Sequence, residues 1–166
     1  RRPWEAPRQG RRRRREAEVH HDVIAFLTAV AEKVGPESRF IHLGMTSSDL
    51  LDTAFALQLT KVSKLIEAGL AKLRAAIKQQ AMTHKHTVMI GRSHGIHAEP
   101  ITFGLKLAVW HDEFGRHEAR LAEAVEGIAV GKLSGAVGTF AHIEPQMEQE
   151  VCAAFGLKPA PASTQI

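Results

Sequence analysis

The chain has 166 residues, with 22 lysines and arginines against 18 aspartates and glutamates, which gives a formal charge of +4. Hydrophobic residues make up 44% of the sequence, enough to build a core, and this argues against wholesale disorder. The single cysteine cannot form an internal disulfide, and no apolar run approaches the ~20 residues of a membrane-spanning helix. These features argue against a small secreted domain held by disulfides and against a helical membrane segment.

The positive charge is concentrated at the start of the chain. Residues 1–15 contain eight arginines and one acid, so the rest of the chain has 14 basic and 17 acidic side chains, about −3 in total. This stretch has no apolar periodicity, and we expect it to be disordered and not native to the domain that follows. An arm that binds RNA stays open as an alternative, because arginine runs also contact phosphates.

The spacing of apolar residues predicts helices over most of the remaining chain. A first helix ends at Gly35-Pro36, which is a helix stop. A second helix runs from about Thr46 to Thr83, roughly 50 Å at 1.5 Å per residue, a length typical of helical bundles and multimeric cores. Its apolar positions form a near-heptad stripe made of Leu51, Phe55, Leu59, Val62, Ile66, Leu70, Leu73 and Ile77.

The helical spacing is interrupted between residues 87 and 102. Residues 87–90 are predicted to be extended, and residues 91–100 form a loop rich in turn residues. Helical spacing then resumes from Leu107 to about Gly131, and a short helix from Pro145 to Phe155 follows. No strand alternation is long enough to build a sheet, so the predicted fold class is all-α.

Two helix starts carry residues that suit an anion site. His20-His21-Asp22 places a carboxylate beside an imidazole, which could orient the ring as a hydrogen-bond donor to an anion. The alternative is a solvated first turn in which Asp22 complements the helix dipole. Thr46-Ser47-Ser48-Asp49 offers hydroxyls and free backbone N–H groups to a carboxylate or phosphate, although plain helix capping explains the same residues. His42 could reach the same anion or simply cover a helix end.

A histidine-containing loop between the long helices is the third candidate. His94 lies at its centre, in Gly91-Arg92-Ser93-His94-Gly95, where an imidazole could donate a proton to a leaving group near neutral pH. A purely structural turn is equally compatible. Four histidines occur between residues 84 and 97, but they match no specific metal signature. The segment 131–139 has the composition of a phosphate loop without its residue order, so we interpret it as a tight turn between closely packed helices.

Taken together and in this order, these segments resemble the adenylosuccinate lyase family of the fumarase/aspartase superfamily. The similarity covers about residues 16–166, and the combination of the first three strings is fairly specific to this family. The matching strings are HDV at 21–23, TSSD at 46–49, GRSHGIHAEP at 91–100, TFGLK at 102–106, GKLSGAVGT at 131–139 and STQ at 163–165.

The resemblance implies a long-helix bundle of the fumarase/aspartase type. Residues 16–45 would be the remainder of an N-terminal helical domain, and residues 46–166 the first part of the central lyase domain. It also implies a cytoplasmic homotetramer of purine biosynthesis, with no metal or organic cofactor and no nucleic-acid or membrane partner. Such enzymes eliminate fumarate from adenylosuccinate, giving AMP, and from a succinyl-carboxamide ribotide.

The resemblance also assigns roles to individual residues. By similarity His94 is the general acid that protonates the departing nitrogen. The substrate-binding residues would be His20, His21, Asp22, His42, Thr46, Ser47 and Gln165.

The sequence departs from the family pattern at two points. The family's general base is a serine on a downstream loop like SSxMPxKxNP, which nothing here matches. We therefore expect a truncated chain, lacking the C-terminal part and inactive alone. His20 stands where many relatives are expected to have arginine. Alternative functions are another superfamily lyase, such as an argininosuccinate lyase or a cycloisomerase-like relative, and a helical module with an RNA-binding arm.

Overall fold

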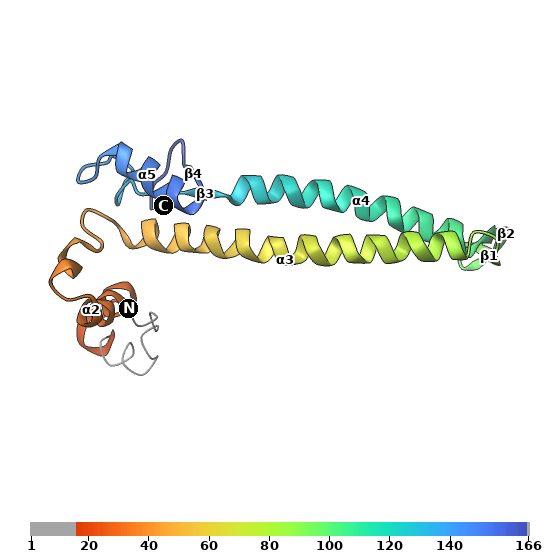
Figure 1. Cartoon of the computed structure of the whole chain (residues 1–166), viewed down its shortest axis with the longest axis horizontal. Coiled ribbons are helices and arrows are strands. Elements are labelled where there is room, and N and C mark those ends of the chain that lie inside the picture. Colours follow the sequence, from red (N-terminus) through yellow and green to blue (C-terminus); the bar gives the residue numbers. More distant parts are fainter. Residues whose placement is uncertain (1–15, 166) are drawn as a thin grey trace. The chain divides into compact units, whose positions relative to one another are not determined.

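The computed structural model describes residues 16–165 (Figure 1). The expectation of disorder for residues 1–15 lies outside the described residues. The chain divides into two compact units. Unit 1 contains the described residues up to Thr53 together with Gly131–Ala154 and the residues from Lys158 onward, whereas unit 2 contains Ala54–Val130 and Phe155–Leu157. The predicted boundary between residues 45 and 46 stays a prediction.

Unit 1 contains short helices and the beginning of a long one. Helix α2 (Asp22–Val34) ends at Gly35, whose φ of 82° provides the left-handed turn that stops the helix, as predicted. A 3₁₀ helix, η1 (Pro36–Phe40), follows. Helix α5 (Pro145–Phe155) is the predicted short helix, most of which belongs to this unit. The buried apolar residues of unit 1 are Val23, Ala25, Ala29, Leu133 and Cys152.

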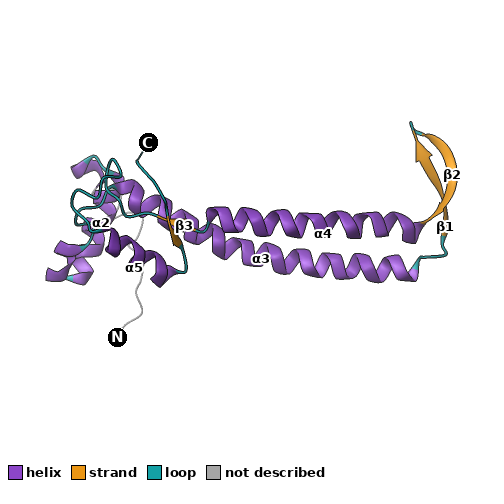
Figure 2. Ribbon diagram, turned by 90° about the horizontal axis from the view of Figure 1, so that it is seen from above, coloured by secondary structure: helices purple, strands orange, loops and turns teal. Residues whose placement is uncertain are grey.

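Two long helices make up most of unit 2. Helix α3 (Ser47–Thr83) contributes its residues from 54 onward, and α4 (Phe103–Ile128) runs antiparallel beside it (Figures 1 and 2). A hairpin of β1 (Val88–Ser93) and β2 (Ile96–Thr102) joins them at one end. Both helices agree with the periodicity of the sequence, and the all-α class is confirmed.

The hairpin corrects the prediction of a loop over residues 91–100. β1 and β2 pair antiparallel, with Val88 opposite Thr102 and Ser93 opposite Ile96. The register shifts at Gly91, where a Cβ would lie 2.6 Å from a backbone oxygen of the facing strand. This irregularity and a mostly exposed surface leave no alternation of apolar and polar residues, which is why the strands are not visible in the sequence. A shorter pair, β3 (Val130–Gly131) with β4 (Lys158–Pro159), was also missed.

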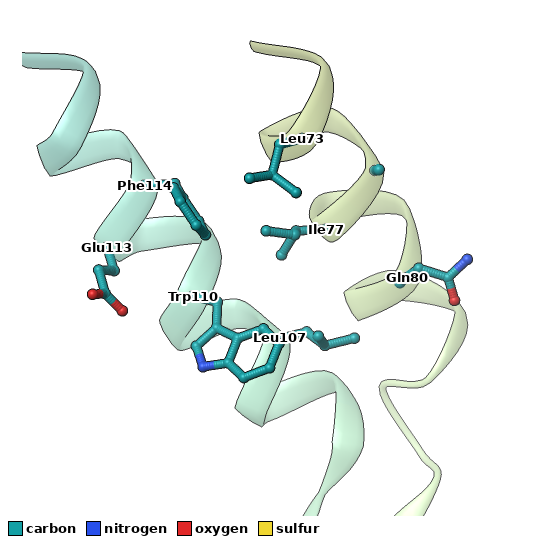
Figure 3. A pocket seen from close by; sticks show the side chains of 8 residues that line it. Leu73, Ile77, Gln80, Leu107, Trp110, Glu113 and Phe114 are labelled. Carbon is teal, nitrogen blue, oxygen red and sulfur yellow. The ribbon is translucent and has the colours of Figure 1, made fainter. Parts of the chain in front are cut away.

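The facing surfaces of α3 and α4 do not close completely. A groove of about 490 Å³ lies between them, with Leu73 and Ile77 on α3 opposite Trp110 and Phe114 on α4 (Figure 3). Ile77 is 8% exposed, but much of the near-heptad stripe is open to solvent within the described residues. Exposures of 44–57% are found for Leu51, Phe55, Val62, Ile66 and Leu73.

Candidate functional site

The N-terminus of α3 is organised by one buried carboxylate. Asp49 is 1% exposed and accepts hydrogen bonds from the backbone N–H groups of Thr46 and Gly135, both at 3.0 Å, and of Ser134 at 3.4 Å. The bond back to Thr46 is one half of a capping box, in which the third helical residue holds the cap residue. The other two bonds reach the loop at 131–139. Asp49 therefore ties the start of α3 to a loop that is distant in sequence.

The hydroxyl group of Thr46 does not cap the helix. It contacts the side-chain amide oxygen of Gln165, 119 positions away. Within residues 16–165, the backbone N–H groups of Ser47 and Ser48 have no hydrogen-bond acceptor. Free N–H groups at a helix N-terminus suit a carboxylate or phosphate. Thr46, Ser47 and Ser48 are thus free to bind an anion, while Asp49 stabilises the start of the helix.

The loop at 131–139 is held from the α3 side through Lys132. The backbone of Lys132 exchanges two hydrogen bonds with the hydroxyl of Thr53, at 3.0 and 3.1 Å. Its ammonium group donates to the carbonyl oxygen of Thr164 at 2.9 Å and lies 3.4 Å from Asp52 and 4.0 Å from Asp49. The side chain is only 8% exposed, so these carboxylates compensate a charge that has little access to water.

The same loop is also held by α5 and by the segment that ends at Gln165. Glu148 is 4% exposed and accepts from the backbone N–H of Leu133 at 2.7 Å. The hydroxyls of Ser134 and Ser163 lie 2.8 Å apart. Buried backbone donors need partners, and here side chains supply them. The segment contains a turn at residues 136–137, and it also serves as a docking element for α3 and α5.

The histidines at the start of α2 adopt a mainly structural arrangement. His21 is the N-cap residue, and its Nδ1 accepts from the backbone N–H of Ile24 at 3.4 Å. The same Nδ1 lies 3.7 Å from a carboxylate oxygen of Asp22, which occupies the first helical turn. His20 precedes this cap with a φ of 52°.

His42 and His94 are also held in unusual backbone conformations. His42 has a φ of 72°, and its Nε2 is buried without a hydrogen-bond partner among residues 16–165. His94 and Gly95, with φ of 51° and 78°, form the two-residue turn of the β1–β2 hairpin. Positive φ at both central residues is the signature of a type I′ turn, which suits the twist of paired strands. His94 is exposed and forms no hydrogen bond to another described residue.

The structure brings only some of the predicted site residues together. Thr46 and Gln165 are in contact, and Ser47 is adjacent to Thr46. In the described part of the chain, no hydrogen bond or ion pair joins His20, His21 or His42 to this pair. His94 belongs to unit 2, whereas the other predicted site residues belong to unit 1.

Comparisons with known proteins place the chain in a family. The sequence profile of the family described as Lyase matches residues 11–166. The chain belongs to this lyase family. It is 60% identical over 151 residues to the adenylosuccinate lyase of Synechocystis sp., 51% over 150 residues to that of Bacillus subtilis, and 49% over 152 residues to that of Aquifex aeolicus. These matches cover 90–92% of this chain but only 35% of each relative's length.

Solved structures of related enzymes share the fold. The fumarate lyase from Mesorhizobium sp. BNC1 matches with a TM-score of 0.88 and 32% identity, over 96% of this chain and 38% of that one. The 3-carboxy-cis,cis-muconate lactonizing enzyme from Pseudomonas putida matches with a TM-score of 0.83 and 30% identity, over 96% of this chain and 37% of that one. The fold is thus shared by family members with different reactions.

Two further observations concern metal sites and membrane-spanning helices. Among residues 16–165, no group of three or more His, Cys, Asp or Glu side chains is arranged to hold a metal ion. None of the described helices is both long and apolar enough to cross a membrane.

Sequence reasoning missed the residues that hold the site of this lyase-family chain together. The sequence indicates Asp49 only as a cap or part of an anion site, and it indicates no role for Lys132 or Glu148. The strings TSSD and GKLSGAVGT contain Asp49 and Lys132, two members of this network. Their mutual contact was not predictable, because residues 85 positions apart meet only once the chain has folded.

Burial also distinguishes Cys152 from a reactive thiol. Burial raises the pKa of the Cys152 thiol, the charge of Glu148 raises it further, and a backbone hydrogen bond from Gly131 acts in the opposite direction. A raised pKa keeps the thiol protonated near neutral pH, and a protonated thiol is a poor nucleophile. Cys152 therefore belongs to the core of unit 1 and not to the candidate site.

Proposed function

We propose that this chain forms the substrate-binding and general-acid part of an adenylosuccinate lyase. Such an enzyme eliminates fumarate from adenylosuccinate, giving AMP, and from the succinyl-carboxamide ribotide of purine biosynthesis. One observation carries the proposal: 49–60% identity, over about nine-tenths of the chain, to three enzymes that bear this name. Relatives with other reactions share the fold at only 30–32% identity.

The chemistry of the elimination explains why a histidine turn suits this role. A base removes the proton next to a carboxylate, the carbanion is stabilised as an aci-carboxylate, and a general acid protonates the nitrogen that leaves. Histidine changes its charge near neutral pH and can supply that proton. His94 is exposed at the tip of a hairpin whose turn fixes its backbone, which supports its assignment as the general acid.

The start of α3 supports the assignment of the succinyl-binding residues. Thr46 and Ser47 would bind the substrate carboxylates with their hydroxyls, aided by the free N–H groups of the first helical turn. Gln165 contacts Thr46 and would offer its amide to the same ligand. His20, His21, Asp22 and His42 complete the proposed pocket by resemblance.

The remaining parts of the proposal concern the whole protein. The chain spans about a third of the length of the curated relatives it matches, and the serine loop expected to hold the general base is not among its 166 residues. We infer a homotetrameric cytoplasmic enzyme. The exposed apolar stripe of α3 supports assembly with further helices, because large apolar patches mark interaction surfaces.

A chimaera tests the proposed reaction. Residues 16–165 replace the matching segment of the Synechocystis adenylosuccinate lyase, and the loss of adenylosuccinate absorbance is followed over time. We expect the chimaera to turn over substrate and the 166-residue chain alone to show none. In the chimaera, His94→Asn should lower kcat by about 10²- to 10⁴-fold, the usual contribution of a general acid.

The matched control is His86→Asn, which changes another exposed histidine just before the same hairpin. It should leave kcat unchanged. An inactive but correctly folded chimaera would refute the assignment of substrate, and full kcat in the His94 variant would refute the assignment of the general acid.

A further inference from the structure

Lys132 forms a contact with the segment 163–165 that has no part in the proposed function. Its ammonium group donates to the carbonyl oxygen of Thr164 at 2.9 Å, and Thr164 directly precedes Gln165. Lysine is rarely buried to this degree unless its charge is paired. Here Asp52 and Asp49 lie 3.4 and 4.0 Å from the ammonium nitrogen. The charge of the lysine is thus balanced by two nearby carboxylates, and its hydrogen bond goes to the backbone of this segment.

Two further bonds attach the same segment to the loop at 131–139. The hydroxyl of Ser163 lies 2.8 Å from that of Ser134, and the backbone N–H of Gln165 donates to the carbonyl of Ala136 at 3.3 Å. Three successive residues, 163–165, are therefore each fixed to one loop. Of the three contacts, only the one from Lys132 involves a charged group, and charge-assisted hydrogen bonds are the stronger kind.

Thr46, the residue that contacts the Gln165 side chain, is held by Asp49, which is itself paired with Lys132. Thr46 contacts Gln165 through its hydroxyl, and its backbone N–H is held at 3.0 Å by Asp49. Asp49 also binds two backbone N–H groups of the loop that contains Lys132. Asp49 thus holds the backbone of Thr46, and Lys132 holds the backbone next to Gln165. This pair of buried side chains brings the Thr46 hydroxyl and the Gln165 amide together.

We propose that Lys132 is a positioning residue that sets the Gln165 amide against the Thr46 hydroxyl without contacting the substrate itself. This inference rests on the proposed function for the role of Gln165. The ammonium group donates a hydrogen bond to Thr164 and is paired with the carboxylates of Asp52 and Asp49, so its interactions are made within the protein. Its effect on substrate must therefore pass through Gln165.

Steady-state kinetics of the chimaera test whether Lys132 affects substrate binding through Gln165. Lys132→Met keeps the length of the side chain and removes the charge, and we expect KM for adenylosuccinate to rise about tenfold with kcat nearly unchanged, the sign of lost ground-state binding. Lys132→Arg should restore most of the affinity, because it keeps a buried cation. Lys64→Met changes an exposed lysine of α3 and should leave KM unaltered.

A double variant separates positioning from general damage. If Lys132 acts through Gln165, adding Lys132→Met to Gln165→Ala should raise KM no further, because contacting residues are not additive. Multiplication of the two effects would overturn the proposal. So would a Lys132→Met variant with unchanged KM.

Hydrogen exchange of the 166-residue chain gives a readout that does not require enzymatic activity. Lys132→Met should accelerate exchange of the amides at 163–165 relative to Lys64→Met, while helix α2 keeps its protection. Unchanged exchange at 163–165 would overturn the proposal even if the chimaera shows no activity. Faster exchange together with an inactive chimaera would leave the positioning contact intact and refute only the proposed reaction.

Discussion

Asp49→Ala should cost unit 1 much of its stability, because Asp49 is buried and holds three backbone N–H groups. The carboxylate is buried, accepts three backbone N–H bonds and lies 4.0 Å from the ammonium of Lys132. Removing it leaves a buried cation with reduced compensation and three donors without an acceptor. Breaking a buried pair in this way costs about 3–5 kcal/mol. That is a large share of the ~5–15 kcal/mol by which a domain is stable.

Native-state hydrogen exchange of the peptide covering residues 131–139 measures this loss where it occurs. A loss of 3 kcal/mol in the free energy of opening corresponds to exchange that is more than about a hundredfold faster, at 1.4 kcal/mol per factor of ten. Asp52→Ala is the matched control, since Asp52 lies even closer to Lys132, at 3.4 Å, but is 64% exposed. An exposed ion pair contributes ~0–1 kcal/mol, so the control should change exchange less than about tenfold. Equal effects of the two variants would refute the importance of burial.

Three further predictions follow from single contacts. Gly138 has a φ of 75°, and a Cβ added there would lie 1.8 Å from the carbonyl oxygen of Ser163. Gly138→Ala should therefore prevent the segment at 163–165 from docking and raise the KM of the chimaera for adenylosuccinate. Arg74→Met should destabilise unit 2 by ~1 kcal/mol or less, since the pair of Arg74 with Glu118 is about one-third exposed, and a double-mutant cycle in urea measures the coupling. Burial raises the pKa of the Cys152 thiol, so the folded state favours the protonated form. The free energy of unfolding should therefore fall as the pH rises past the ordinary thiol pKa of 9.0. Cys152→Ala should remove that part of the pH dependence of the urea midpoint.

The helices could be predicted from the sequence because their signals are local. The end of α2 at Gly35 depends on the absence of a side chain at a left-handed position. The end of α3 at Thr83 and the start of α5 at Pro145 follow from periodicity and from a residue that fits a first helical turn. In each case the deciding interactions lie within a few positions along the chain.

The hairpin and the network around Asp49 could not be predicted in the same way. The β1–β2 turn uses His94-Gly95 instead of the more familiar Asn-Gly, and Gly91 interrupts the alternation of the first strand. The contact between Thr46 and Gln165 joins residues 119 positions apart. Contacts of this kind have no periodicity of their own and depend on the tertiary structure.

The backbone conformations of the histidines connect stability to the proposed chemistry. The described residues include four non-glycine residues with positive φ, and three of them are His20, His42 and His94, all predicted as site residues from the sequence. Such a conformation costs an ordinary side chain ~1–2 kcal/mol, which glycine would avoid. Histidine tolerates it better than most residues, yet stability alone would still favour glycine at each of these positions. Strained residues are concentrated at functional sites, where the interactions of the surrounding structure hold them in place. The hairpin turn itself accounts for the positive φ of His94, so the coincidence of strain and resemblance supports a binding role chiefly for His20 and His42.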